Sequence, residues 1–310
     1  MPVETSSAIN CVSGHKVLIK RINENNKSIA IVEKIIGHKN DVGVDILSYV
    51  YEYGFSPDYS EEVMHEVELL PNEVNEKDLE GRVDLRDEMI FTIDGIDTKD
   101  IDDAISIKQL NEEEYELGVH IADVSHYVKK DGYIDEDAFI RGTSVYLVDR
   151  VVPMLPHKLS NGICSLNPEV DRLALSCVMK INSKGYVKEY KIFKSVIKSK
   201  KQMNYDDVNS ILIDNKIPSG YEEYVPYLKD MQKLSNILRK KMVNKGYLEF
   251  NIPEAKILVD DNCHPTSVYA KEQREGEKLI ENFMIVANET VAGFVEDKKL
   301  PGIYRVHDKP

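Results

Sequence analysis

Residues 91–107 read FTIDGIDTKDIDDAISI, a stretch that sets five aspartates between two apolar β-type segments. Phe91 to Ile93 predicts one strand, and Ala104 to Ile107 predicts the next. Gly95 permits a sharp excursion of the chain between them. Carboxylates packed this densely repel one another unless cations compensate. The stretch therefore predicts a strand, an acidic turn and a second strand.

Segments on either side of this turn read as strands and helices. Further strands are predicted from short apolar or alternating runs over residues 16–20, 28–32, 115–124, 174–181 and 187–196. Helices are predicted from apolar spacing and from Ser, Pro or Gly at their ends, over residues 61–70, 135–141, 226–244 and 276–296. The two long helices have apolar stripes that indicate packing in the core. Together these elements predict an α+β fold.

The composition is that of a globular protein. Apolar residues make up 42% of the 310-residue chain and charged residues 30%, enough for a core and too apolar for disorder. No apolar run approaches the roughly 18 residues of a membrane helix, and the N-terminus lacks a secretory signal. Four dispersed cysteines form no CxxC pair, which disfavours a zinc knuckle or a disulfide framework and predicts a cytoplasmic protein. The net charge of −14 disfavours a nonspecific nucleic-acid coat protein, but it allows an enzyme that admits one strand locally.

Aspartates of the acidic turn are candidate metal ligands, namely Asp94, Asp100, Asp102 and Asp103. In an extended chain Asp100 and Asp102 face the same way, while Asp103 points across. Oxygen ligands without nearby His or Cys suit Mg²⁺, or Mn²⁺, better than zinc. Four carboxylates carry about the charge that two divalent ions cancel, and such ion pairs promote phosphodiester cleavage.

Three alternative roles for the acidic turn differ in how well the sequence supports them. A calcium loop of EF-hand type requires Gly and Glu at the positions of Lys99 and Ile105, so a loop of that type is excluded. A glycine-rich phosphate loop is absent from the sequence. A solvated acidic turn stays open from the spacing alone.

Several ordered motifs around the turn resemble the ribonuclease II family, most closely its bacterial ribonuclease R branch. They lie at residues 37–47, 92–95, 99–104, 118–127, 141–147, 153–156 and 159–173. The resemblance covers roughly residues 14–310. It implies a mixed sheet-based catalytic domain flanked by helices and preceded by an OB-fold (cold-shock) remnant. The expected domains are a remnant over 1–37, a connector over 38–85 and a catalytic domain over 86–310 that is incomplete at its C-terminus.

The resemblance also implies a function. The family's members remove nucleotides from the 3′ end of single-stranded RNA, so we expect a magnesium-dependent 3′→5′ exoribonuclease that releases nucleoside 5′-monophosphates. The family's catalytic aspartates fall on the four candidates above, which form the expected metal site. Asp102 is expected to be the most critical of them for the chemical step. A monomer that does not bind membranes is expected.

Three residues are implied to contact RNA. Tyr146 falls where the family has an aromatic that stacks near the 3′-terminal base, and Phe250 falls at its clamp partner. Each ring could instead be a core aromatic; the resemblance favours stacking for Tyr146 and leaves Phe250 open. Glu281 is the third residue, next to Asn282, where the family usually has a second Glu.

Two further functional hypotheses remain. The family's later arginine-rich segment and RNA-binding barrel would lie beyond Pro310, so the chain could be an RNA-binding, catalytically silent fragment. A domain stabilised by a structural metal is the third hypothesis. His120 and His126 are interpreted as structural, and Cys164 and Cys177 as buried thiols.

Overall fold

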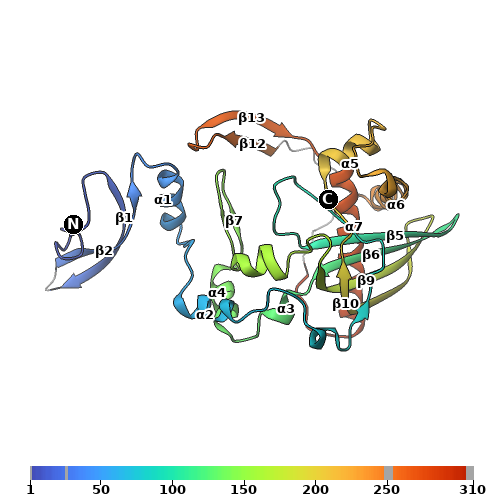
Figure 1. Cartoon of the computed structure of the whole chain (residues 1–310), viewed down its shortest axis with the longest axis horizontal. Coiled ribbons are helices and arrows are strands. Elements are labelled where there is room, and N and C mark those ends of the chain that lie inside the picture. Colours follow the sequence, from blue (N-terminus) through green and yellow to red (C-terminus); the bar gives the residue numbers. More distant parts are fainter. Residues whose placement is uncertain (1, 25–26, 248–253, 305–310) are drawn as a thin grey trace. The chain divides into compact units, whose positions relative to one another are not determined.

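The computed structural model describes residues 2–24, 27–247 and 254–304 (Figure 1). The chain divides into two compact units. The first unit comprises Met1–Glu66, Asp131–Pro156 and Pro253–Lys271, and the second comprises Val67–Lys130, His157–Ile252 and Glu272–Pro310. The domain boundaries expected from the sequence stay a prediction. Within the described ranges, no helix combines the length and the apolarity needed to cross a membrane.

The first unit contains three two-stranded antiparallel pairs and short helices. Strands β1 (His15–Glu24) and β2 (Lys27–His38) pair with two register shifts, and they confirm the strands predicted over 16–20 and 28–32. The other pairs are β7 (Val145–Tyr146) with β8 (Val151–Val152) and β12 (Glu254–Val259) with β13 (Pro265–Lys271). The helices are α1 (Val44–Glu52), α4 (Tyr133–Arg141) and α2 (Glu61–Glu68), whose last two residues belong to the second unit.

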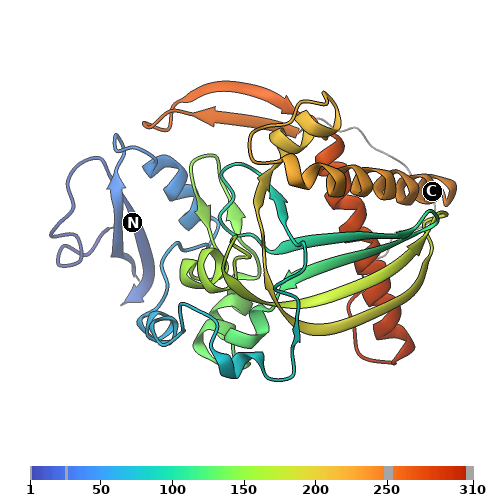
Figure 2. The ribbon, with the colours of Figure 1, turned by 45° about the vertical axis from the view of Figure 1, so that its right-hand side comes forward.

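The second unit is built on a five-stranded sheet of order β3-β10-β9-β6-β5. Its strands are β3 (Val83–Asp84), β5 (Asp103–Asn111), β6 (Glu114–Ala122), β9 (Asp171–Asn182) and β10 (Val187–Lys198). All neighbours are antiparallel except β3, which runs parallel to β10. Strand β6 ends at Ala122, two residues earlier than predicted, because Val124 begins the short helix α3 (Val124–Tyr127). Figure 2 shows the long strands side by side, with helices along one face of the sheet.

Helices α5 (Tyr205–Leu212), α6 (Val225–Asn244) and α7 (Glu275–Asp297) pack on that face. Both long helices were predicted, and each contributes its apolar stripe to the core, as Leu228 and Phe283 illustrate. Alternate residues of the strands, such as Ile105 and Leu117, complete this core because side chains alternate across a sheet. The remaining elements are η1 (Glu76–Leu79), η2 (Lys158–Ile163), η3 (Glu222–Tyr224) and the parallel pair β4 (Thr92–Asp94) and β11 (Gln202–Asn204).

The α+β class predicted from the sequence is confirmed by this arrangement of sheet and helices. Cys164 and Cys177 are buried free thiols, as predicted. Burial raises the pKa of Cys164 to about 12 and that of Cys177 to about 11, because a thiolate is poorly solvated in an apolar core. Both thiols are therefore unreactive core residues.

Candidate active site

The four candidate aspartates lie in and beside the loop that joins β4 to β5. Asp94 ends β4, where it is paired in register with Asn204 of β11. Asp103 begins β5, in register with Ile121 of β6. The loop is thus anchored on strands at both ends, and Asp100 lies in the span between the anchors. The structure confirms the predicted sequence of strand, acidic turn and strand.

The aspartates are close enough to perturb one another electrostatically. Burial, together with the charges of Asp103, Asp100 and Asp102, raises the pKa of Asp94 to about 7. Burial and the charge of Asp102 raise the pKa of Asp103 to about 6. Burial and the charge of Asp100 likewise raise the pKa of Asp102. The loop therefore carries excess negative charge, and binding of either protons or cations stabilises it.

The donor set fits a hard cation, because these side chains offer oxygen ligands. The arrangement of these side chains supports a metal site less well than their chemistry does. Across the part of the chain that the structure describes, no group of three or more His, Cys, Asp or Glu side chains is arranged to hold a metal ion. The carboxylates share an electrostatic environment without forming a closed set of ligands. A metal site in this loop therefore stays a prediction.

Tyr205 is a neighbour of the aspartates that the sequence did not single out. It follows Asn204 and is the first residue of α5; the Asn204 side chain caps this helix by accepting a hydrogen bond from the Asp207 amide at 2.8 Å. Burial raises the pKa of Tyr205, and the charges of Asp94 and Asp103 raise it further. Its phenol therefore remains protonated beside the carboxylates. The parallel pairing of β11 with β4 brings it there from more than a hundred residues away, which no local pattern indicates.

The structure describes two of the three residues predicted to contact RNA. Tyr146 belongs to the first unit, on β7, and is 66% exposed, so it is not a core aromatic. Phe250 lies outside the described residues. Glu281 of α7 accepts a hydrogen bond from Gln273, and the adjacent Asn282 is buried and donates to Ser235 Oγ at 2.8 Å. Their roles in RNA binding stay predictions.

His120 and His126 are engaged in hydrogen bonds that support their structural interpretation. His120 is fully buried between two serines, with Nδ1 at 2.7 Å from Ser176 Oγ and Nε2 at 3.1 Å from Ser106 Oγ. Burial lowers its pKa to about 4, so it is neutral at physiological pH. His126 Nε2 lies 3.0 Å from an oxygen of Asp78.

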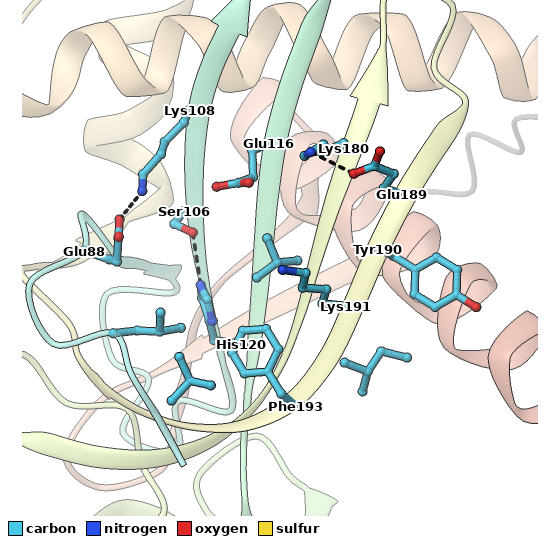
Figure 3. Close-up of a pocket in the computed structure, with 14 residues that line it drawn as sticks. Glu88, Ser106, Lys108, Glu116, His120, Lys180, Glu189, Tyr190, Lys191 and Phe193 are labelled. Atoms are coloured by element: carbon cyan, nitrogen blue, oxygen red, sulfur yellow. Dashed lines mark hydrogen bonds and ion pairs between the residues drawn. The ribbon is translucent and has the colours of Figure 1, made fainter. Parts of the chain in front are cut away.

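A cavity of about 870 Å³ lies on the sheet face opposite α6 and α7 (Figure 3). Its charged lining consists of Lys108, Lys180, Lys191, Glu88, Glu116 and Glu189. Lys108 pairs with Glu88 at 2.6 Å and Lys180 with Glu189 at 2.7 Å. Three cations facing three anions give no preference for a phosphate backbone, and none of the four aspartates lines the cavity. The acidic loop is therefore the stronger candidate site.

Comparison with known proteins agrees with the motifs in this loop. The RNB domain family matches residues 82–310, and the cold shock domain family matches residues 2–60. The chain belongs to the RNB domain family. The resemblance drawn from the sequence motifs is thereby confirmed, because the matched region contains the acidic loop and the sheet that carries it.

Individual relatives of this RNB-domain chain are named ribonuclease R. It is 45% identical to Ribonuclease R 1 of Lactococcus lactis over 90% of this chain and 34% of that protein. It is 46% identical to Ribonuclease R of Thermotoga maritima over 91% of this chain and 40% of that protein. Its fold matches Mycoplasma genitalium RNase R, solved with ribose-methylated single-stranded RNA, with a TM-score of 0.91 and 30% identity over 99% of this chain and 48% of that one. The chain thus spans less than half the length of these relatives.

Proposed function

We propose that this chain carries the catalytic carboxylates of a magnesium-dependent 3′→5′ exoribonuclease that hydrolyses single-stranded RNA to nucleoside 5′-monophosphates. The observation that carries the proposal is the loop in which burial and three neighbouring carboxylates raise the pKa of Asp94 to about 7. Carboxylates held together at such an electrostatic cost are typical of functional sites. The ribonuclease R names of the relatives support the exoribonuclease class.

The proposed chemistry assigns separate tasks to the residues of the loop. Asp94, Asp100 and Asp103 would hold magnesium, and Asp102 would act closest to the chemical step. When bound, magnesium supplies positive charge against the phosphate oxygens and lowers the pKa of water. In the reaction a water oxygen bonds to phosphorus, the bond to the 3′ oxygen breaks, and that oxygen leaves with a proton. The carboxylates must be ionised to bind the cation, so acidification through the raised pKa values of Asp94 and Asp103 opposes binding.

RNA recognition in this proposal relies on stacking, with no reading of base edges. The exposed ring of Tyr146 can stack on any base, and such stacking contributes about 1–3 kcal/mol per base. This tolerance suits an exonuclease that must accept every nucleotide in turn.

The test compares wild-type protein with Asp102→Asn and with Asp97→Asn on single-stranded RNA labelled at its 5′ end, in magnesium. Asp97 is a matched control because it lies in the same loop and is exposed. We expect wild type and Asp97→Asn to give progressively shorter labelled RNA, and Asp102→Asn to be slower by at least about 100-fold. Equal cleavage by wild type and Asp102→Asn refutes the role of Asp102. Early release of the labelled 5′ nucleotide refutes the direction.

A second candidate function is an RNA-binding chain that lacks activity by itself. It is favoured by two observations: the chain spans 34–48% of the relatives' length, and the described side chains form no closed metal-ligand group. Binding of an oligonucleotide without release of mononucleotides, with activity restored when the C-terminal part of a ribonuclease R relative is appended, supports this function. Robust turnover by the chain alone eliminates it.

A further inference from the structure

Ser165 bonds the backbone of the acidic loop on both sides of Asp100. It lies between η2 and β9, is fully buried, and its hydroxyl donates to the Lys99 carbonyl at 2.8 Å and accepts from the Ile101 amide at 3.1 Å. The Ser165 hydroxyl thus acts both as a hydrogen-bond donor and as an acceptor. The Leu166 amide adds a bond to the Ile101 carbonyl at 2.9 Å. Residues 165 and 166 therefore run alongside the loop and form hydrogen bonds with residues 99–101.

Ser165 is in turn hydrogen-bonded to a strand of the sheet. Arg172, buried near the start of β9, donates from Nε to the Ser165 carbonyl at 2.7 Å. Farther along the loop, the Ala122 amide of β6 donates to the Asp102 carbonyl at 2.9 Å. Two neighbouring strands of the sheet thus hold the loop at points on either side of Ile101, and Ser165 provides the contact that brackets Asp100.

Fixing the peptide groups next to a carboxylate restricts the directions in which its side chain can point. Contacts of this outer kind orient metal ligands, and their loss typically weakens metal binding by roughly 10–100-fold. We propose that Ser165 is a positioning residue that aims Asp100 at the cation, an inference that rests on the proposed function. Ser165 belongs to the sequence motif at 159–173. The roles assigned to the aspartates of the acidic loop do not account for this motif.

The test compares wild type with Ser165→Ala and with Ser195→Ala. Ser195 is a matched control because it is a fully buried serine of β10 whose hydroxyl bonds Ser176 and the Ala174 carbonyl, away from the loop. The measurements are hydrogen exchange of the Ile101 amide, Mn²⁺ affinity by electron paramagnetic resonance, and kcat and KM for labelled RNA over a range of Mn²⁺ concentrations. Should Ser165→Ala fail to fold, the nearly isosteric Ser165→Cys, whose thiol is a weak donor, replaces it.

We expect Ser165→Ala to bind Mn²⁺ about 10–100-fold more weakly and to exchange the Ile101 amide faster. We expect its kcat to recover at high Mn²⁺ with KM for RNA unchanged, and Ser195→Ala to match wild type in all three measurements. Mn²⁺ affinity unchanged in folded Ser165→Ala, or reduced equally in Ser195→Ala, overturns the proposal.

The proposed function can fail separately from the role of Ser165. Absence of Mn²⁺ binding by wild type overturns the metal site itself. Exchange of the Ile101 amide then decides the role of Ser165 in holding the loop. Faster exchange in Ser165→Ala alone supports that role, and unchanged exchange overturns it.

Discussion

Replacing Asp94 with asparagine is expected to stabilise the metal-free protein. The pKa of this carboxyl in the folded chain is about 7, against an ordinary value of 3.8. Between these values the folded chain keeps a proton that the unfolded chain has released. The contribution of Asp94 to the free energy of unfolding therefore falls as the pH rises from 3.8 to 7 and is lowest above that window. Asparagine removes the charge that causes this loss.

The size of the effect follows from the shift in pKa. At about 1.36 kcal/mol per unit, a rise from 3.8 to about 7 sets an upper limit of about 4 kcal/mol. Asp94 is only half-buried, so screening by water reduces this to about 1–2 kcal/mol at pH 8. The advantage of Asp94→Asn over wild type should narrow steadily as the pH is lowered from 8 toward 4.

Urea unfolding in EDTA at pH 4.5, 6 and 8 measures this difference. Asp97→Asn is the control, since its exposed carboxyl in the same loop should give no comparable gain. Added Mg²⁺ should raise the stability of wild type more than that of Asp94→Asn, because binding to the folded state is linked to stability. If Asp94→Asn is no more stable than wild type at pH 8, or if the gap does not depend on pH, the carboxylates of the acidic loop do not repel one another as inferred.

Three further outcomes are expected. His120, whose pKa is lowered from 6.5 to about 4, contributes stability that is present above pH 6.5 and lost toward pH 4. In urea unfolding, the stability advantage of wild type over His120→Gln should therefore shrink by up to about 3 kcal/mol as the pH falls from 6.5 to 4, because the opposing effect of Asp94 is common to both proteins. Gly118→Ala should lower the free energy of unfolding by about 1–3 kcal/mol, because its added methyl would collide with Ser106 Oγ and His120, and Ser106→Ala should relieve part of that loss. Tyr146→Ala should weaken binding of single-stranded RNA by about 5–100-fold in a fluorescence anisotropy titration, whereas Tyr146→Phe should not.

The acidic loop was predictable from the sequence because its determinants are local. All four candidate aspartates lie within ten residues, and the strands that flank them carry apolar residues at alternate positions. The long helices α6 and α7 were predicted for the same reason, since their buried positions repeat with helical spacing. Where neighbouring residues determine an element, periodicity is sufficient.

Contacts between distant segments were not predictable in this way. Tyr205 lies beside Asp94 only because β11 pairs with β4, and Ser165 brackets Asp100 only because the segment before β9 runs along the loop. Helix α5 and the hairpin of β12 and β13 were also missed. The Asn204 cap was the available signal for α5, but the short helix that it starts is stabilised chiefly by packing on α6 and α7.

Whether the acidic loop gathers its aspartates to hold divalent cations is tested most directly by locating the cation. Crystals grown with MnCl₂ and measured at the manganese absorption edge provide that measurement. We expect an anomalous peak within coordination distance of oxygens from Asp94, Asp100 and Asp103, and no such peak in Asp94→Asn crystals. Ordered density for all four aspartates with no manganese among them, at millimolar Mn²⁺ and pH 8, would contradict a metal-binding role for the loop.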